Sequence, residues 1–203
     1  MLVDMTSKAA LFPAVSFLRV ASIAAPLLAA GCAHRHNSEV RAAFQRELAS
    51  RPSATESLRQ WCEARGIARP AQIRARRLAG TASPPAELFD RLRVPADTAL
   101  GYRQVELSCG GAVLSSAQLW YVPALLTPAM RKTLDETDTP FGQAVSALNF
   151  SRERMSESVK ADRACPARTI LVHKAVLRLP NGDGLALVIE CYTRANLERP
   201  RAR

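Results

Sequence analysis

Residues 102–123 constrain this chain most, because they predict two β-strands joined by a tight turn. In the first run Val105 and Leu107 alternate with polar residues, which is typical of a half-buried strand. Gly110 and Gly111 follow, and a Gly-Gly pair between two such runs predicts a two-residue hairpin. The second run is apolar on both faces, so we expect it in the centre of a covered sheet.

Strict alternation divides this second run into two faces. One face is expected to hold Val113, Ala117, Leu119 and Tyr121, and the other Leu114, Trp120 and Val122.

Further strands are predicted at 73–79, 169–179 and 185–193. Residues 180–184 read Pro-Asn-Gly-Asp-Gly, a strong turn signal between the last two strands. Residues 185–189 are apolar on both faces, which again predicts a central position. Short turns of this kind join antiparallel strands.

Helices are predicted around these strands from apolar spacing and capping residues. A helix over 38–51 has an apolar stripe at i, i+4 and i+8 and should stop at Pro52. Ser53 and Glu56 form a capping box for a second helix, in which Trp61 is expected to be a core anchor. A short helix is expected at 86–92. Thr127-Pro128 and Thr139-Pro140 predict two helix starts in tandem.

The N-terminus predicts a lipoprotein-type signal peptide over residues 1–31. Lys8 and Arg19 precede an apolar run over 20–30, and Cys32 follows Ala-Ala-Gly. This resembles a bacterial lipoprotein signal, in which the cysteine becomes the lipidated first residue. We therefore expect lipidation of Cys32, a tether over 32–37, and a location in the bacterial cell envelope, lipid-anchored in the periplasm. The alternative is an ordinary buried helix.

Export changes the interpretation of the cysteines. Setting Cys32 aside leaves four, which can pair in three ways in an oxidising periplasm, or stay as small buried residues. Disulfides are therefore expected among Cys62, Cys109, Cys165 and Cys191. The three histidines are scattered and no Cys-x-x-Cys is present, so neither a metal nor a cofactor is predicted.

The charge balance is basic, with 28 Lys and Arg against 18 Asp and Glu, but no recognition element accompanies it. The densest cluster, Arg74, Arg76 and Arg77, is interpreted as a solvated face. Together with the export signal, this argues against nucleic acid as a partner. No apolar run of about 18 residues or more is free of charge, so no ordinary membrane-spanning helix is predicted.

The hairpin, the segment Thr139-Pro140-Phe141-Gly142 and the late strand ending in Glu190 together resemble the chorismate lyase family. The family cleaves chorismate to 4-hydroxybenzoate and pyruvate. Its fold is shared with effector domains of some bacterial transcription regulators. The resemblance implies an α+β fold over residues 38–195, in which an antiparallel sheet carries helices on one side, with a loose tail over 196–203.

The sequence of residues 150–168 is compatible with either a helix or a strand. Met155 and Val159 are four residues apart, which suits a helix, whereas the family has a strand near this position.

Glu190 is the first candidate for chemistry, because a carboxyl group at the end of a doubly apolar strand is costly to bury unless paired or protonated. The resemblance implies a ligand-binding role for it, and a tentative catalytic role as a proton source. The alternatives are a structural ion pair with one of the many arginines, or simple exposure at the end of the strand. Phe141 matches the family's apolar lid position.

The two arginines with which the family grips carboxylates are not matched. An alignment without gaps places Gln104 and Leu119 at their positions, with Arg103 one residue away from the first. A one-residue shift turns a strand side chain to the opposite face of the sheet. The candidate ligand-binding residues are therefore Arg103, Gln104, Leu119, Phe141 and Glu190.

We expect an exported lipoprotein that binds a small aromatic or acidic molecule. Chorismate is a cytoplasmic intermediate, so lyase chemistry is not expected outside the cytoplasm. Whether the chain is an enzyme stays open. The first alternative is an active chorismate pyruvate-lyase, a carbon–oxygen lyase that produces 4-hydroxybenzoate. The second is a structural or interaction lipoprotein of the envelope without a ligand.

Overall fold

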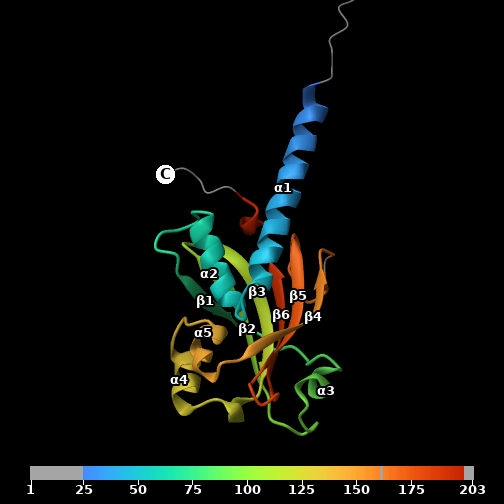
Figure 1. The fold of residues 1–203 in the computed structure, drawn as a ribbon. Helices are drawn as coiled ribbons and strands as arrows, with labels where there is room; N and C mark the ends of the chain where they lie inside the picture. Colours follow the sequence, from blue (N-terminus) through green and yellow to red (C-terminus); the bar gives the residue numbers. More distant parts are fainter. Residues whose placement is uncertain (1–24, 161, 199–203) are drawn as a thin grey trace, which may run out of the picture. The chain divides into compact units, whose positions relative to one another are not determined.

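Figure 1 shows the computed structural model of the chain, which describes residues 25–160 and 162–198. The chain divides into two compact units, Met1–His36 and Asn37–Arg203. Helix α1 (Ala25–Ala49) begins in the first unit. Residues 1–24 of the predicted signal peptide lie outside the described residues. The fold that follows is that of the second unit.

Helix α1 differs from the prediction at residues 32–37, where a tether was expected and the backbone is helical. Pro26 lies in the first turn, where proline is tolerated, and Gly31 costs a helix only about 1 kcal/mol relative to alanine. Nothing else in the sequence stops the helix before Pro52. Among the described residues, no helix combines the length and hydropathy needed to span a membrane.

The described residues form one antiparallel sheet of six strands in the order β1-β2-β3-β6-β5-β4. The strands are β1 (Ile73–Leu78), β2 (Gly101–Cys109), β3 (Ala112–Tyr121), β4 (Ser151–Ser158), β5 (Leu171–Arg178) and β6 (Gly184–Tyr192). Strands β3 and β6 lie in the middle and every residue of β6 is buried, as their doubly apolar sequences predict. The α+β class is confirmed.

The β2–β3 hairpin turns at Gly110 and Gly111, whose φ angles of 55° and 86° suit a type I′ turn. A bulge in the pairing lies between Leu107 and Ser108, opposite Leu114. The predicted faces of β3 are therefore wrong at its start. Leu114 packs in the same cluster as Ala117, because one extra residue reverses the alternation.

The helices of the second unit are short and follow the capping residues. Ser53 caps α2 and Thr127 caps α4, each by accepting a hydrogen bond from the amide three residues on. The helices are α2 (Ala54–Ala64), α3 (Leu88–Leu92), α4 (Pro128–Glu136) and α5 (Phe141–Ala144), with 3₁₀ turns η1 (Pro123–Leu125), η2 (Ser146–Leu148) and η3 (Arg194–Asn196).

Two clusters cover the same face of the sheet, here called the helical face (Figure 1). The α1–α2 cluster includes Val40, Phe44, Leu48, Leu58, Trp61, Val105 and Leu107. The α4–α5 cluster includes Leu134, Phe141, Val145, Leu119, Leu177 and Val188. Helix α3 packs on the opposite face, against Trp120, Leu187 and Ile189. Trp61 is a core anchor as predicted, and its indole N–H donates to the carbonyl of Asn196 at 3.2 Å.

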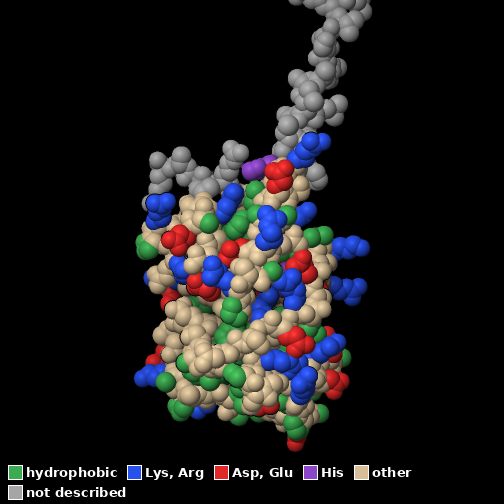
Figure 2. Space-filling view, in the orientation of Figure 1, with side chains coloured by type: hydrophobic (Ala, Val, Ile, Leu, Met, Phe, Trp, Pro, Cys, Tyr) green, Lys and Arg blue, Asp and Glu red, His purple; other side chains and the backbone are tan. Residues whose placement is uncertain are grey.

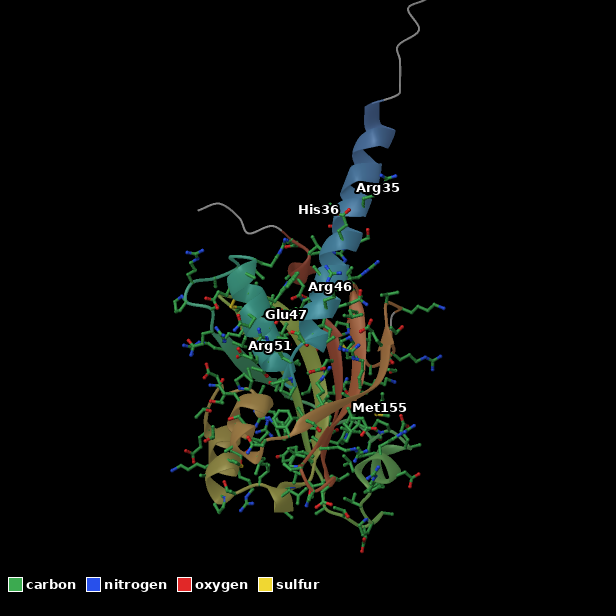
Figure 3. All side chains as sticks on the ribbon, viewed as in Figure 1. Arg35, His36, Arg46, Glu47, Arg51 and Met155 are labelled. Carbon is green, nitrogen blue, oxygen red and sulfur yellow. A yellow bond between two sulfur atoms is a disulfide. The ribbon has the colours of Figure 1, made fainter. Side chains whose placement is uncertain are left out.

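The helix considered for residues 150–168 is wrong for residues 151–158, because they form strand β4. Met155, labelled in Figure 3, packs in the cluster on the α3 side, whereas Val159 is 54% exposed. The two residues do not share a buried stripe. Two apolar positions are too few to define a period, and a bulge between Arg154 and Ser156 disturbs the alternation of the strand.

Two disulfides cross-link the second unit. Cys62 of α2 is joined to Cys109 of β2, and Cys165 is joined to Cys191 of β6. The four cysteines thus adopt one of the three pairings that the sequence allowed.

Charged side chains are dispersed on the face shown in Figure 2, where Lys and Arg lie among Asp and Glu over several elements. Arg74 pairs with Asp138 and Arg76 with Glu106. This cluster of arginines is thus exposed and ion-paired.

Candidate functional site

A groove opens on the helical face between the start of α2, the start of β1 and the α5–η2 segment, and is called the α2–α5 groove. Its volume is about 610 Å³. Small-molecule pockets usually measure about 300–1,000 Å³, so the groove can hold a ligand. Its walls are Pro52, Ser53, Thr55, Glu56, Arg59, Ala71, Gln72, Ile73, Gly142, Gln143, Ser146, Asn149 and Phe150.

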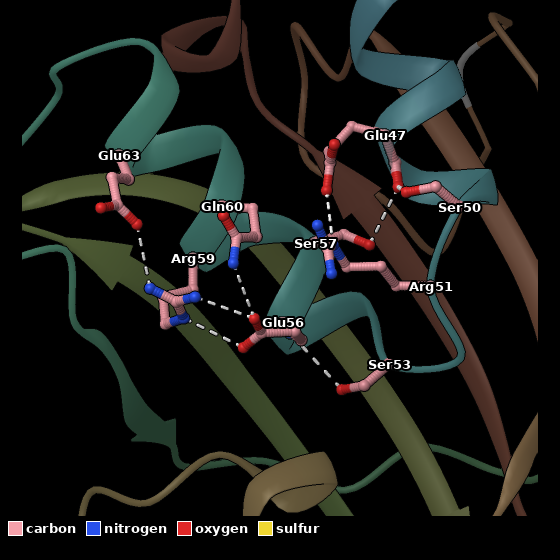
Figure 4. A network of polar contacts seen from close by, with 9 residues as sticks. All are labelled: Glu47, Ser50, Arg51, Ser53, Glu56, Ser57, Arg59, Gln60 and Glu63. Atoms are coloured by element: carbon pink, nitrogen blue, oxygen red, sulfur yellow. Dashed lines mark hydrogen bonds and ion pairs between the residues drawn. The ribbon is translucent and has the colours of Figure 1, made fainter.

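The α2 wall of the groove carries charges that are already paired (Figure 4). Arg59 donates to Glu56 through Nη2 at 2.9 Å and to Glu63 through Nη1 at 3.1 Å. The hydrogen bond from Arg59 holds the pKa of Glu56 below its usual range. Glu56 is engaged with Arg59, so only the Ser53 half of the predicted capping box forms. Arg59 therefore offers the groove little net positive charge.

The start of α2 is fixed to the end of α1. The Ser57 hydroxyl donates to the carbonyl of Glu47 at 3.1 Å, and Arg51 pairs with the Glu47 carboxylate at 2.9 Å (Figure 4). Ser57 is fully buried, so its hydroxyl needs such a partner. These bonds hold Ser53 and Thr55 at the edge of the groove.

A smaller space, called the inner chamber, lies behind the groove against the sheet. It measures about 50 Å³ and is lined by Thr55, Val105, Leu107, Ala117, Leu119, Pro140, Phe141, Gly142, Arg152, Leu177, Val188 and Glu190. Thr55 and Gly142 line both spaces, and the place where the two linings share these residues is called the neck. A Cβ atom on Gly142 would lie 3.1 Å from Ser53 Oγ and 3.4 Å from Thr55 Oγ1. A side chain at position 142 would therefore crowd the neck.

The polar end of the inner chamber is an ion pair between Arg152 of β4 and Glu190 of β6. Their side chains are 4% and 10% exposed. The pair joins Arg152 Nη2 to Glu190 Oε2, which also accepts from the Tyr192 hydroxyl at 3.1 Å. Burial pulls the pKa of Arg152 down, but Glu190, Tyr192 and Glu157 together outweigh burial, so the pKa is raised. Burial first and Glu190 second raise the pKa of Tyr192 well above its usual value.

His173 of β5 supports this pair from beneath. Its ring is fully buried, with Nδ1 3.1 Å from Arg152 Nη2 and Nε2 2.8 Å from Glu157 Oε2. These partners assign a neutral ring that accepts at Nδ1 and donates at Nε2. Burial, and then the charge of Arg152, lower the pKa of His173. The neutral form leaves the Arg152–Glu190 pair without an added charge.

The structure brings three of the sequence-predicted ligand residues together. Leu119, Phe141 and Glu190 line the inner chamber. Gln104 lies on the opposite face, near Gly80, because its neighbour Arg103 points to the helical face.

Arg103 is 2% exposed and lies beneath α4, where Nη1 donates to the carbonyl of Leu134. That carbonyl belongs to the last turn of the helix, whose orphan acceptors and dipole favour a cation. Burial, and then the charge of Arg77, lower the pKa of Arg103. Arg103 is absent from the lining of both the groove and the chamber. It therefore caps a helix.

Arg152 and Thr55 are site residues that sequence reasoning missed. Strand β4 is short of apolar residues, and its segment was left open between a helix and a strand, so the alternation that turns Arg152 inward was not used to predict the site. The signal for Thr55 was available, because it lies inside the predicted capping box.

The arrangement is suited to binding. Arg59, Arg103 and Arg152 are each engaged, by carboxylates or by a helix end, so none is left as a free carboxylate grip. No group of three or more potential metal ligands gathers within residues 25–160 and 162–198.

No protein-family model matches the chain. Among curated proteins, it is 36% identical over 174 residues to a protein described as "Uncharacterized protein y4mC" from Sinorhizobium fredii. That alignment covers 75% of this chain and 73% of the relative.

Among solved structures, the chain resembles PhnF from Mycobacterium smegmatis, with a TM-score of 0.52 and 14% identity over 73% of this chain and 67% of PhnF. Against the effector domain of PhnF alone, the TM-score is 0.51 with 14% identity, over 70% of this chain and 89% of that domain. These similarities show the fold, and the predicted chorismate lyase-like fold is confirmed.

Proposed function

This chain belongs to the same family as y4mC of Sinorhizobium fredii, and from that premise we propose that it binds a small molecule in the bacterial cell envelope. The ligand occupies the α2–α5 groove and extends one end through the neck into the inner chamber. The groove and the chamber share Thr55 and Gly142 in their linings, and this adjacency is the observation that carries the proposal.

The sizes of the two spaces assign different parts of the ligand to them. The groove, at about 610 Å³, has room for a ring system. The chamber, at about 50 Å³, has room for a group of a few atoms, since one water occupies about 30 Å³. Phe150 in the groove and Phe141 in the chamber provide apolar contacts for an aromatic ligand.

Binding without lyase chemistry follows from the state of the arginines. Chorismate carries two carboxylates, and a guanidinium binds a carboxylate best with two parallel hydrogen bonds. Arg152 is committed to Glu190, and Arg103 to the end of α4. The proposal also draws on the fold, which in PhnF forms the effector domain.

The envelope location is proposed from the N-terminal pattern and supported by the cysteines. The segment before Cys32 has the order of a lipoprotein signal. The Cys62–Cys109 and Cys165–Cys191 disulfides favour an oxidising compartment, because disulfides rarely persist in a reducing cytosol. Substitution of Cys32 by alanine should abolish labelling of the protein with palmitate in the source cell. Unchanged labelling would refute the anchor.

Thermal unfolding tests the binding proposal. The purified protein should melt at a higher temperature with at least one member of a panel of small aromatic and acidic molecules that includes 4-hydroxybenzoate. A ligand at 100 times its Kd stabilises the folded state by about 2.7 kcal/mol. A Ser146→Trp variant, which fills the groove, should lose the shift.

Ala147→Trp is the matched control. Ala147 is adjacent and exposed but does not line the groove, so this variant should keep the shift. The absence of a shift across the panel, or an equal shift with Ser146→Trp, would contradict binding in the groove.

A further inference from the structure

The inner chamber ends in two polar atoms that the protein leaves without partners. Both hydrogen bonds to Glu190 go to Oε2, and Oε1 accepts none from the described residues. Arg152 uses Nη2 for both of its contacts, and Nη1 makes no hydrogen bond with the described residues. Neither atom is among those that are fully enclosed without a partner. The two residues that line this end of the chamber therefore keep one acceptor and one donor without a protein partner, whereas Arg152 Nε is fully enclosed without one.

The net charge at this end of the chamber is close to zero. Arg152 and Glu190 are the charged residues in its lining, and the other lining residues are apolar or, for Thr55, a neutral hydroxyl. His173 beneath them is held neutral by burial and by Arg152. A negative group that enters would meet the Glu190 carboxylate as well as the guanidinium, in a space with little water to screen them.

We propose that the group a ligand buries in the inner chamber is uncharged and both donates and accepts hydrogen bonds, as a primary amide or a hydroxyl does. This inference rests on the proposed function and names the ligand class. The amide oxygen accepts from Arg152 Nη1 while its N–H donates to Glu190 Oε1. A carboxylate can use only the first atom and is repelled by the second.

The residues at the neck support the same assignment. A Cβ atom on Gly142 would already lie close to the Ser53 and Thr55 hydroxyl oxygens, so a flat or small group suits this place best. Desolvating an amide or a hydroxyl is far less costly than desolvating a carboxylate, and both polar atoms of the amide find partners. The apolar body of the ligand remains in the groove beside Phe150.

Matched pairs of ligands test the proposal with the full chain. Benzamide and benzoate, 2-naphthamide and 2-naphthoate, and 3-phenylpropanamide and 3-phenylpropanoate differ only in the terminal group. Isothermal titration calorimetry at pH 7.5 should give at least about tenfold tighter binding for the amide of the tightest pair, which corresponds to about 1.4 kcal/mol.

A charge change in the chamber should reduce or cancel this preference. Glu190→Gln removes the repelling carboxylate and leaves Arg152 without a counter-charge, so the acid should bind at least about tenfold tighter relative to its amide than in the wild type. Glu106→Gln is the matched control. Glu106 is also a strand carboxylate paired with an arginine, Arg76, and its strand position turns it to the opposite face. The Glu106→Gln variant should therefore show the same preference between amides and acids as the wild type.

The outcomes separate this inference from the proposed function. Equal or tighter binding of the acids by the wild type overturns the inference and leaves the proposed function standing. If neither member of any pair binds, the inference fails, and the proposed function fails as well if no member of the panel raises the melting temperature. The wild-type comparison decides the matter even if Glu190→Gln does not fold.

Discussion

Two buried arginines on the helical face have different roles: one stabilises the end of a helix, and the other lines the candidate site. Arg103 of β2 lies beneath α4 and donates to the Leu134 carbonyl at the helix end. Arg152 of β4 lies in the gap between the two helical clusters and pairs with Glu190. Burial alone lowers the pKa of both groups, but for Arg152 the nearby Glu190, Tyr192 and Glu157 together reverse the direction, so that its pKa is raised.

Both arginines are buried, so it is the group that accepts their hydrogen bonds that decides whether each arginine has a structural role or lines the site. A helix end supplies a fraction of a charge and is satisfied by the contact. A carboxylate supplies a full charge and keeps a second oxygen for another donor. Arg103 lines neither the groove nor the chamber, whereas Arg152 and Glu190 keep Nη1 and Oε1 without a protein partner in the chamber lining. The Nε atom of each arginine is enclosed without a partner. Three experiments test this difference.

The largest effect is expected for Arg152→Met. It leaves the Glu190 carboxylate buried without its cation, which should lower the free energy of unfolding by about 3–5 kcal/mol at pH 7.5. Urea denaturation with an unchanged m-value measures the loss.

The double variant Arg152→Met/Glu190→Gln is the control for this loss. Removing both charges avoids the unpaired carboxylate, so much of the stability should return. An equal loss in the double variant would show that packing, and not the ion pair, is responsible.

A smaller effect is expected from pH through His173. Its folded-state pKa is lowered, so the unfolded chain binds the proton more readily, and the free energy of unfolding should fall as pH drops below about 6.5. The groups around the ring are Arg152, Arg154, Glu157, Glu190 and Tyr192.

The slope due to this histidine is at most about 1.4 kcal/mol per pH unit. Urea denaturation of the wild type and of His173→Gln between pH 7.5 and 5 measures it, and the variant should show the flatter profile. Parallel profiles would mean that the ring titrates as freely in the folded state as in the unfolded chain.

The smallest effect is expected for Arg103→Met. The variant loses one hydrogen bond to the end of α4, but it no longer buries a guanidinium without a carboxylate. The free energy of unfolding should stay within about 1 kcal/mol of the wild type, and the preference between amides and acids should not change. A loss as large as that of Arg152→Met would contradict the contrast between the two regions.

Much of the fold could be predicted, because strands and capped helices produce residue patterns over short stretches of sequence. The Gly110-Gly111 turn and the apolar run at 185–189 located the centre of the sheet. Two predictions about the sheet failed for local reasons. The bulge opposite Leu114 reversed a face, and β4 has too few apolar residues to show its period.

The candidate site could be predicted only in part. Glu190, Leu119 and Phe141 were identified and lie together in the chamber. Arg152 was not, because it comes from an edge strand separated from β6 by β5, and strand order is set by long-range pairing. The groove walls come from residues 52–59, 71–73 and 142–150, which no local pattern connects.

The sequence by itself determined every strand except β4, the turns, the helix starts at the capping residues Ser53 and Thr127, and the presence of a costly carboxyl group at the end of a buried strand. Only the tertiary structure decided which arginine meets that carboxyl group, which one caps a helix, and where a groove remains open. The physical reason is the separation in sequence of the residues that interact. Backbone conformation responds to neighbours a few residues away, whereas ion pairing and cavity formation depend on segments that only the folded chain brings together.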